Sequence, residues 1–190
     1  LRISVHNANL KFVSHTMLVG HYVSSTLTGT EGVVDRFIGG VMSASLAAGL
    51  SPEATGTHQI FTNNRQDPDS PLSLPRPPHV VVAGLGEEGK LQPAELVQSV
   101  KHGVIAWAQH VSEQSPASAT FELAATLIGS GGIGMTAGQS AQLIVKGVAF
   151  ASPLVAGFTE DLDKAFTPQQ EYYLGRAVAR GALPPYGGGP

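Results

Sequence analysis

The stretch Ala124–Val148 reads AATLIGSGGIGMTAGQSAQLIVKGV and decides the fold class. An apolar run over Leu123–Ile128 predicts a buried strand, and the glycines within Gly129–Gly134 predict a tight turn. Thr136 and Gln139 have the spacing of a capping box, which predicts the start of a helix rich in Ala, Leu, Ile and Val. A strand, a turn and a helix in this order are typical of a sheet that is covered by helices.

The same glycine-rich turn is a candidate anion site. Because the N–H groups in the first turn of a helix have no intrahelical partners, such a junction can bind a phosphate. A purely geometric role for the glycines stays equally open, since one G-x-G-x-x-G pattern is weak evidence. The candidate ligand-binding residues are Gly129, Ser130, Gly131, Gly132, Ile133 and Gly134, with Gly132 expected to be the most sensitive to substitution.

Composition restricts the classes of protein to which the chain can belong. Its 190 residues are 42% hydrophobic and 13% charged, which predicts one α/β domain of ordinary size with tails. A net charge of −3 without a basic run argues against a nucleic-acid partner. The chain has no cysteine, which is compatible with a cytoplasmic protein, and no apolar stretch long enough to predict a membrane span. Since Leu1 is neither an initiating Met nor part of a signal peptide, we expect the chain to be a piece of a longer polypeptide.

Hydrophobic periodicity predicts a three-layer α/β/α domain with a mixed, mostly parallel sheet. The two runs without polar alternation, Val80–Ala83 and Leu123–Ile128, are predicted to be adjacent central strands. We expect the α/β domain to span residues 1–152, and residues 153–190 to form a C-terminal helix and a mobile Pro/Gly-rich tail. The predicted strands are Leu1–His6, Thr16–Tyr22, His58–Thr62, His79–Ala83 and Leu123–Ile128, and the predicted helices are Val33–Leu50, Ala94–His110, a helix after Thr136, and Thr167–Arg180.

Three of these segments carry a resemblance to a known family. They are the run GVVDRFIGG over Gly32–Gly40, the strand and turn Val80–Gly86, and Lys90–Pro93 with the long helix that follows. In order and spacing they resemble the N-terminal domain of leucyl aminopeptidases, which implies a macro-domain-like fold over roughly residues 1–152. The resemblance implies that Gly129–Gly134 corresponds to the loop that cradles the diphosphate of ADP-ribose. It also places Gly29, Thr30, Gly32 and Asp35 at the second glycine-rich loop.

The chain departs from the macro pattern at residues that matter for activity. The acidic residue that holds the adenine is replaced by the turn Asn7-Ala8-Asn9, and Glu31 would place a negative charge in a phosphate-binding loop unless it points away. The catalytic, metal-binding half of an aminopeptidase is missing from these 190 residues. No two histidines have the i,i+4 spacing of a helical metal site, and no serine stands in a G-x-S-x-G elbow. The sequence therefore predicts neither catalytic nor metal-ligating residues.

The sequence favours a non-catalytic binding or regulatory interaction module without a cofactor. Its partner would be another protein or the remainder of a longer polypeptide, through a surface at Tyr172, Tyr173 and Leu174 on the predicted last helix. Homo-oligomer formation stays open. The alternative is a macro-type domain that binds, and could hydrolyse, ADP-ribose or another nucleotide diphosphate at Gly129–Gly134.

Overall fold

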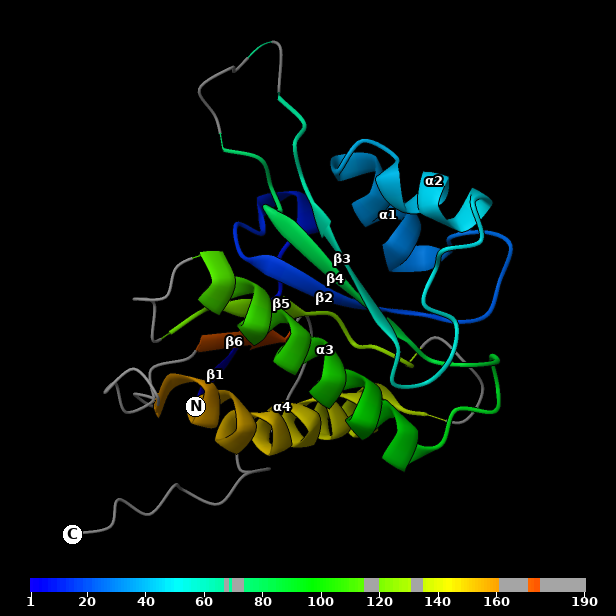
Figure 1. Cartoon of the computed structure of the whole chain (residues 1–190). Coiled ribbons are helices and arrows are strands. Elements are labelled where there is room, and N and C mark those ends of the chain that lie inside the picture. The colour runs from blue at the N-terminus through cyan, green and yellow to red at the C-terminus, as the bar shows by residue number, and fades with distance from the viewer. Residues whose placement is uncertain (67–68, 70–73, 115–119, 131–134, 161–170, 175–190) are drawn as a thin grey trace, which may run out of the picture.

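The computed structural model describes residues 1–66, 69, 74–114, 120–130, 135–160 and 171–174. These residues form a six-stranded sheet with helices on both faces (Figure 1). The elements in chain order are β1 (Arg2–Val5), the 3-10 turn η1 (Leu10–Phe12), β2 (Thr16–His21), α1 (Gly29–Phe37), α2 (Val41–Ala47), β3 (His58–Thr62), β4 (His79–Gly84), α3 (Pro93–Gln114), β5 (Leu123–Ala125), α4 (Ala137–Glu160) and β6 (Glu171–Leu174).

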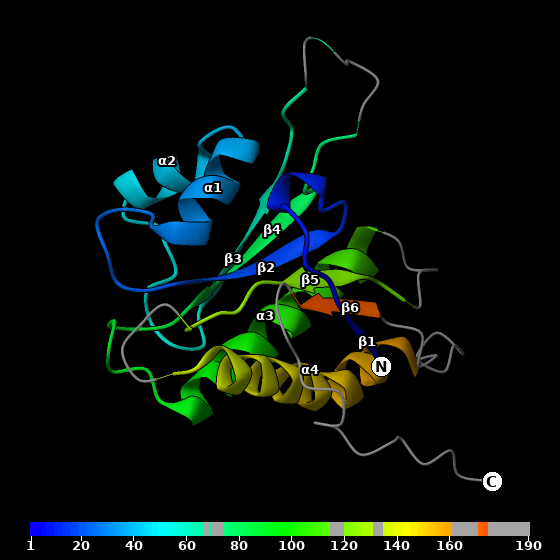
Figure 2. The same cartoon turned by 180° about the vertical axis from the view of Figure 1, so that it is seen from behind.

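The strand order in the sheet is β1-β6-β5-β2-β4-β3. Only the pairing of β3 with β4 is antiparallel, whereas the other four pairings are parallel. This confirms a mixed, mostly parallel sheet. Helices α3 and α4 cover one face, and α1 and α2 lie on the other (Figure 2). The predicted three layers are therefore present.

The two predicted central strands are internal but not adjacent. β4 and β5 each have a neighbour on both sides, as their continuous apolar runs require. The prediction that they pair with each other is wrong, because β2 lies between them and pairs with both. In β2 the buried polar residues Thr16 and His21 conceal from the sequence pattern that this strand occupies the centre. β5 is also shorter than predicted and ends at Ala125.

One predicted helix is divided into two. Val33–Leu50 contains the end of α1 and all of α2, separated by Gly39 and Gly40, each with φ near +83°. A left-handed backbone is accessible to glycine and cannot continue a right-handed helix. The break therefore follows from the glycine pair that the sequence displays.

The predicted last helix is wrong where the structure describes it. Glu171–Leu174 form β6, which pairs in parallel with both β1 and β5. The sequence signals for a helix at Thr167 and Glu171 were local, whereas strand pairing depends on distant partners. The rest of 167–180 and the expected mobile tail lie outside the described residues, and α4 continues to Glu160. The division of the chain at residue 152 stays a prediction.

Within the described ranges, no helix combines the length and apolar composition that crossing a bilayer requires.

Two hydrophobic clusters stabilise the sheet from opposite faces. Under α3 and α4, Leu18, Val81 and Leu123 pack against residues such as Val100 and Ile144. Under α1 and α2, the opposite faces of β2, β4 and β5 pack against Val34, Ile38 and Met42. Because the strands between these layers are buried on both sides, functional groups can reach solvent at the ends of the strands.

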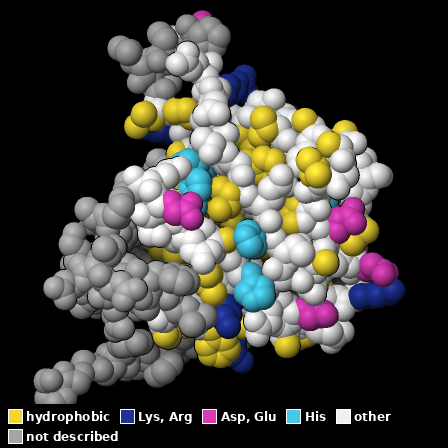
Figure 3. Space-filling model, viewed as in Figure 1, with side chains coloured by type: hydrophobic (Ala, Val, Ile, Leu, Met, Phe, Trp, Pro, Cys, Tyr) yellow, Lys and Arg dark blue, Asp and Glu magenta, His cyan; other side chains and the backbone are white. Residues whose placement is uncertain are grey.

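Histidine side chains lie on the face that α3 occupies (Figure 3). Among the histidines of the chain, the half-buried His79 has a lowered pKa that links stability to pH. The His79 ring contacts Trp107 and His110, with ring centroids 4.9 and 5.7 Å away, and its buried Nδ1 has no partner among the described residues. Burial, and then the neighbouring His110, lower the pKa of His79. In the unfolded chain the pKa of histidine is about 6.5. At a pH between this value and the lower native pKa, His79 is therefore protonated in the unfolded chain and neutral in the native chain.

We therefore expect the free energy of unfolding to fall as the pH drops from 7 through about 6.5, until the pH passes below the native pKa of His79. Denaturant titrations followed by the fluorescence of Trp107, the one tryptophan, measure this slope between pH 7 and pH 5. His79→Gln should make the slope shallower, and the part that remains includes the contribution of His58, whose pKa burial and then His102 also lower. An equal slope in the variant would contradict the assignment to His79.

Candidate functional site

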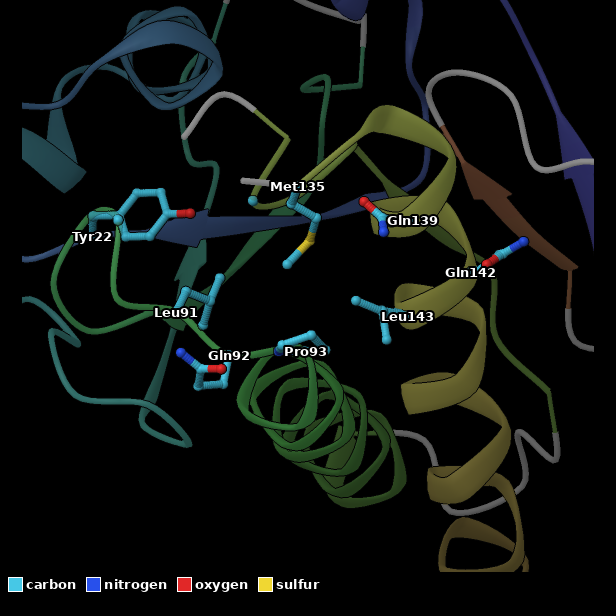
Figure 4. Close-up of a pocket in the computed structure, with 10 residues that line it drawn as sticks. Tyr22, Leu91, Gln92, Pro93, Met135, Gln139, Gln142 and Leu143 are labelled. Atoms are coloured by element: carbon cyan, nitrogen blue, oxygen red, sulfur yellow. The ribbon is translucent and has the colours of Figure 1, made fainter. Parts of the chain in front are cut away.

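A cavity of about 390 Å³ opens at the carboxyl end of the central strands. Figure 4 shows it between the first turns of α3 and α4, with the chain that leaves β2 on the third side. Ligands of open α/β sheets bind in this position, outside the carboxyl ends of the parallel strands. The lining residues are Tyr22, Gly89, Leu91, Gln92, Pro93, Gly129, Met135, Gln139, Gln142 and Leu143.

Three connections of the fold supply these residues. Tyr22 follows β2 directly, and Gly89–Pro93 lie where the chain passes from β4 into α3. Gly129 and Met135 flank the turn between β5 and α4, and the glutamines belong to the start of α3 or α4. Residues far apart in sequence thus meet because their strands are parallel neighbours.

Among the described residues, the lining carries no charged side chain. Leu91, Pro93, Met135 and Leu143 make its walls apolar, and the polar groups are a phenol and three carboxamides. Burial, assisted by the negative charge of Glu88, raises the pKa of Tyr22 above its ordinary value. The phenol therefore keeps its proton at neutral pH and can both donate and accept a hydrogen bond.

The capping box at the start of α4 is confirmed. The Thr136 N–H donates to Gln139 Oε1 over 3.0 Å, and the Gln139 N–H donates to Thr136 Oγ1 over 3.2 Å. Below it, the buried Ser140 hydroxyl donates to the Ile128 carbonyl over 2.6 Å and ties the helix to the turn after β5. Other N–H groups of this first turn have no intrahelical partners and give this end of the helix a partial positive charge.

The predicted glycine-rich turn contributes to the cavity through Gly129. Its neighbour Ser130 is half-buried, with its hydroxyl donating to the Leu127 carbonyl over 2.8 Å. Gly131, Gly132, Ile133 and Gly134 lie outside the described residues, and their role in ligand binding stays a prediction.

The second predicted group lies elsewhere. Gly29, Thr30, Gly32 and Asp35 belong to α1, so they form helical turns rather than a loop, and none of them lines this cavity. The Asp35 carboxylate accepts hydrogen bonds from the Met42 N–H over 2.8 Å, from the Ser43 N–H over 3.3 Å and from the Ser43 hydroxyl. It thereby caps α2, which Gly40 begins without a capping side chain. A ligand-binding role for these four residues stays a prediction.

Glu31 does not leave an unpaired charge in a phosphate loop. Its carboxylate lies 2.8 Å from Nδ1 of His21, and both residues are buried. The pair joins the first turn of α1 to the end of β2. Glu31 is therefore paired with His21, and it is not among the described residues that line the cavity.

Most of the cavity was not found from the sequence. Tyr22, Leu91, Met135 and Leu143 look like ordinary core or loop residues, and only the fold brings them together. Gln139 was recognised as a helix cap, without a role in a site. Among the described residues, no group of three or more His, Asp or Glu side chains is placed to hold a metal ion.

Searches with the sequence found no match to a protein-family model and no match among curated proteins. Solved structures with the same fold exist. The macrodomain of Mycobacterium tuberculosis DarG is 12% identical, with a TM-score of 0.56, and the match covers 92% of this chain and 98% of that one. The fold is macro-domain-like.

Two further matches share this macro-like fold. A Trypanosoma brucei macrodomain in complex with ADP-ribose is 12% identical over 92% of this chain and 64% of that one, with a TM-score of 0.55. A mutant of tomato leucine aminopeptidase is 16% identical over 96% of this chain and 34% of that one, also with a TM-score of 0.55. The fold implied by the resemblance to leucyl aminopeptidases is thus confirmed.

The contacts of Asp35 predict a large effect on stability. Asp35→Ala leaves the buried N–H of Met42 without its acceptor, which should lower the free energy of unfolding by about 1–3 kcal/mol. For a chain of this length the loss corresponds to a fall in Tm of roughly 5 °C, measurable by calorimetry. Asp35→Asn keeps one oxygen as acceptor and should lose less. Equal Tm values for wild type and Asp35→Ala would show that the cap does not stabilise the fold.

Proposed function

We propose that this chain is a binding module for a nucleoside diphosphate of the ADP-ribose kind. The observation that carries the proposal is the cavity at the carboxyl end of the sheet, bounded by Gly129 and by the first turn of α4. A helix N-terminus beside a glycine turn favours a phosphate through its free N–H groups and its dipole. The apolar walls next to it suit an uncharged ring.

Because the described lining is uncharged, we expect the phosphates and the ring system of such a ligand to bind at different places. A diphosphate in the apolar interior would lose its hydration without gaining a counter-charge, because none of the side chains that line it in the described part of the chain is cationic. We therefore place the phosphates beside Gly129 and the first turn of α4, and the ring system inside the cavity.

The sequence predicted an interaction module as the main function and nucleotide binding as the alternative. The comparisons favour nucleotide binding. Two of the solved Trypanosoma brucei macrodomain structures are described as complexes, one with ADP and one with ADP-ribose. A role of Tyr172–Leu174 as a protein-binding surface was argued from a helix, and these residues form a strand. A protein partner, a longer parent polypeptide, a homo-oligomer, a cytoplasmic location and the lack of catalysis stay predictions.

Filling the cavity tests the proposal. Leu143 points into the cavity (Figure 4), so Leu143→Trp should occupy the space of the ligand ring and weaken ADP-ribose binding at least tenfold. Isothermal titration calorimetry measures the affinity, and thermal unfolding measures whether the fold survives. Gln98→Trp is the matched control, because Gln98 is exposed on α3 and does not line the cavity.

We expect Gln98→Trp to bind like the wild type and both variants to unfold within a few degrees of it. Wild-type protein that binds neither ADP-ribose nor ADP would contradict the proposed function. Undiminished binding by Leu143→Trp would place the ligand outside this cavity.

A further inference from the structure

Only the oxygen of the Gln139 carboxamide, Oε1, takes part in capping α4. Oε1 accepts hydrogen bonds from the Thr136 N–H over 3.0 Å and from the Thr136 hydroxyl over 3.1 Å. The Thr136 N–H can only donate, so the atom facing it must be the amide oxygen, and this fixes the orientation of the carboxamide. Nε2 is the other end of the group, and it has no acceptor among the described residues.

This free donor belongs to the wall of the cavity. Gln139 lines it from the first turn of α4, and the Tyr22 hydroxyl points into it from the opposite side (Figure 4). Met135 lies between the two in this view, and Leu91 and Leu143 lie on the side of the cavity nearer to Pro93. A hydrogen-bond donor with a fixed position in an apolar wall selects for an acceptor on the ligand, because a ligand without one leaves the donor unpaired.

Gln142 is a contrast on the same helix. It also lines the cavity and is exposed, as Gln139 is, but its amide is directed away from Leu91 and Leu143 (Figure 4). No capping contact fixes it. The two glutamines therefore differ in whether the amide is held facing the cavity.

We propose that Gln139 determines the specificity of the cavity by donating a hydrogen bond from Nε2 to the uncharged cyclic part of the ligand. This inference rests on the proposed function and adds the chemical class of the enclosed group, a ring that carries a nitrogen or oxygen acceptor. The Tyr22 hydroxyl provides a second contact that can donate or accept. The capping box holds the amide in place before the ligand arrives, so binding loses little side-chain entropy.

Gln139→Glu separates the two roles of this side chain. Glutamate is a standard partner in a capping box and still accepts from the Thr136 N–H. Its charge near the helix N-terminus should keep the Tm equal to or above that of the wild type. The carboxylate has no N–H to donate, so the affinity for ADP-ribose should fall at least tenfold.

Titrations at high ionic strength screen the repulsion between an added carboxylate and the diphosphate of the ligand. Under these conditions Gln98→Glu is the control, since Gln98 is exposed on α3 and does not line the cavity. We expect it to retain an affinity within about threefold of the wild type, measured by calorimetry with ADP-ribose. Equal losses in the two variants would show an effect of charge alone and would overturn the inference. Wild-type affinity in Gln139→Glu would also overturn it, whereas wild-type protein that fails to bind contradicts the proposed function itself.

Discussion

The absence of a side chain at Gly20 is the constraint on which the site depends. A Cβ at this position, one residue before the end of β2, would overlap Ile128 Cγ2 and lie 2.6 Å from Leu85 Cδ1. Both of these neighbours are buried, and they belong to the turns that follow β5 and β4. Because the two turns close over the bare backbone of β2, Gly89–Pro93 and Gly129 come to flank Tyr22. A larger residue at position 20 would push these turns apart and open the cavity.

Local signals predicted much of the fold. The strand His58–Thr62 and the capping box at Thr136 agree with the structure, since alternation and capping depend on residues close in sequence. The wrong predictions concern contacts between residues that are far apart in the sequence. The central position of β2 is concealed by buried polar residues, and β6 is a strand because β1 and β5 lie on either side of it. No window of the sequence contains those neighbours.

The sequence predicted where the candidate site lies but not which residues line it. The turn after β5 marks the correct end of the sheet, and its first residue, Gly129, lines the cavity. The other lining residues come from three connections that meet only in the folded chain, so spacing could not group them. Gln139 shows the limit most clearly: its motif predicted a helix cap, and the structure adds that the free end of the same amide lies in the cavity wall.

The central claim is that the space between the first turns of α3 and α4 holds the ring of a nucleoside diphosphate. A crystal structure of this chain grown with ADP-ribose tests it most directly. The account predicts electron density for a ring between Leu91 and Leu143, within hydrogen-bond distance of Gln139 Nε2, and for the diphosphate beside the Gly129 turn. Ligand density on another face of the molecule, with this cavity empty, would contradict it.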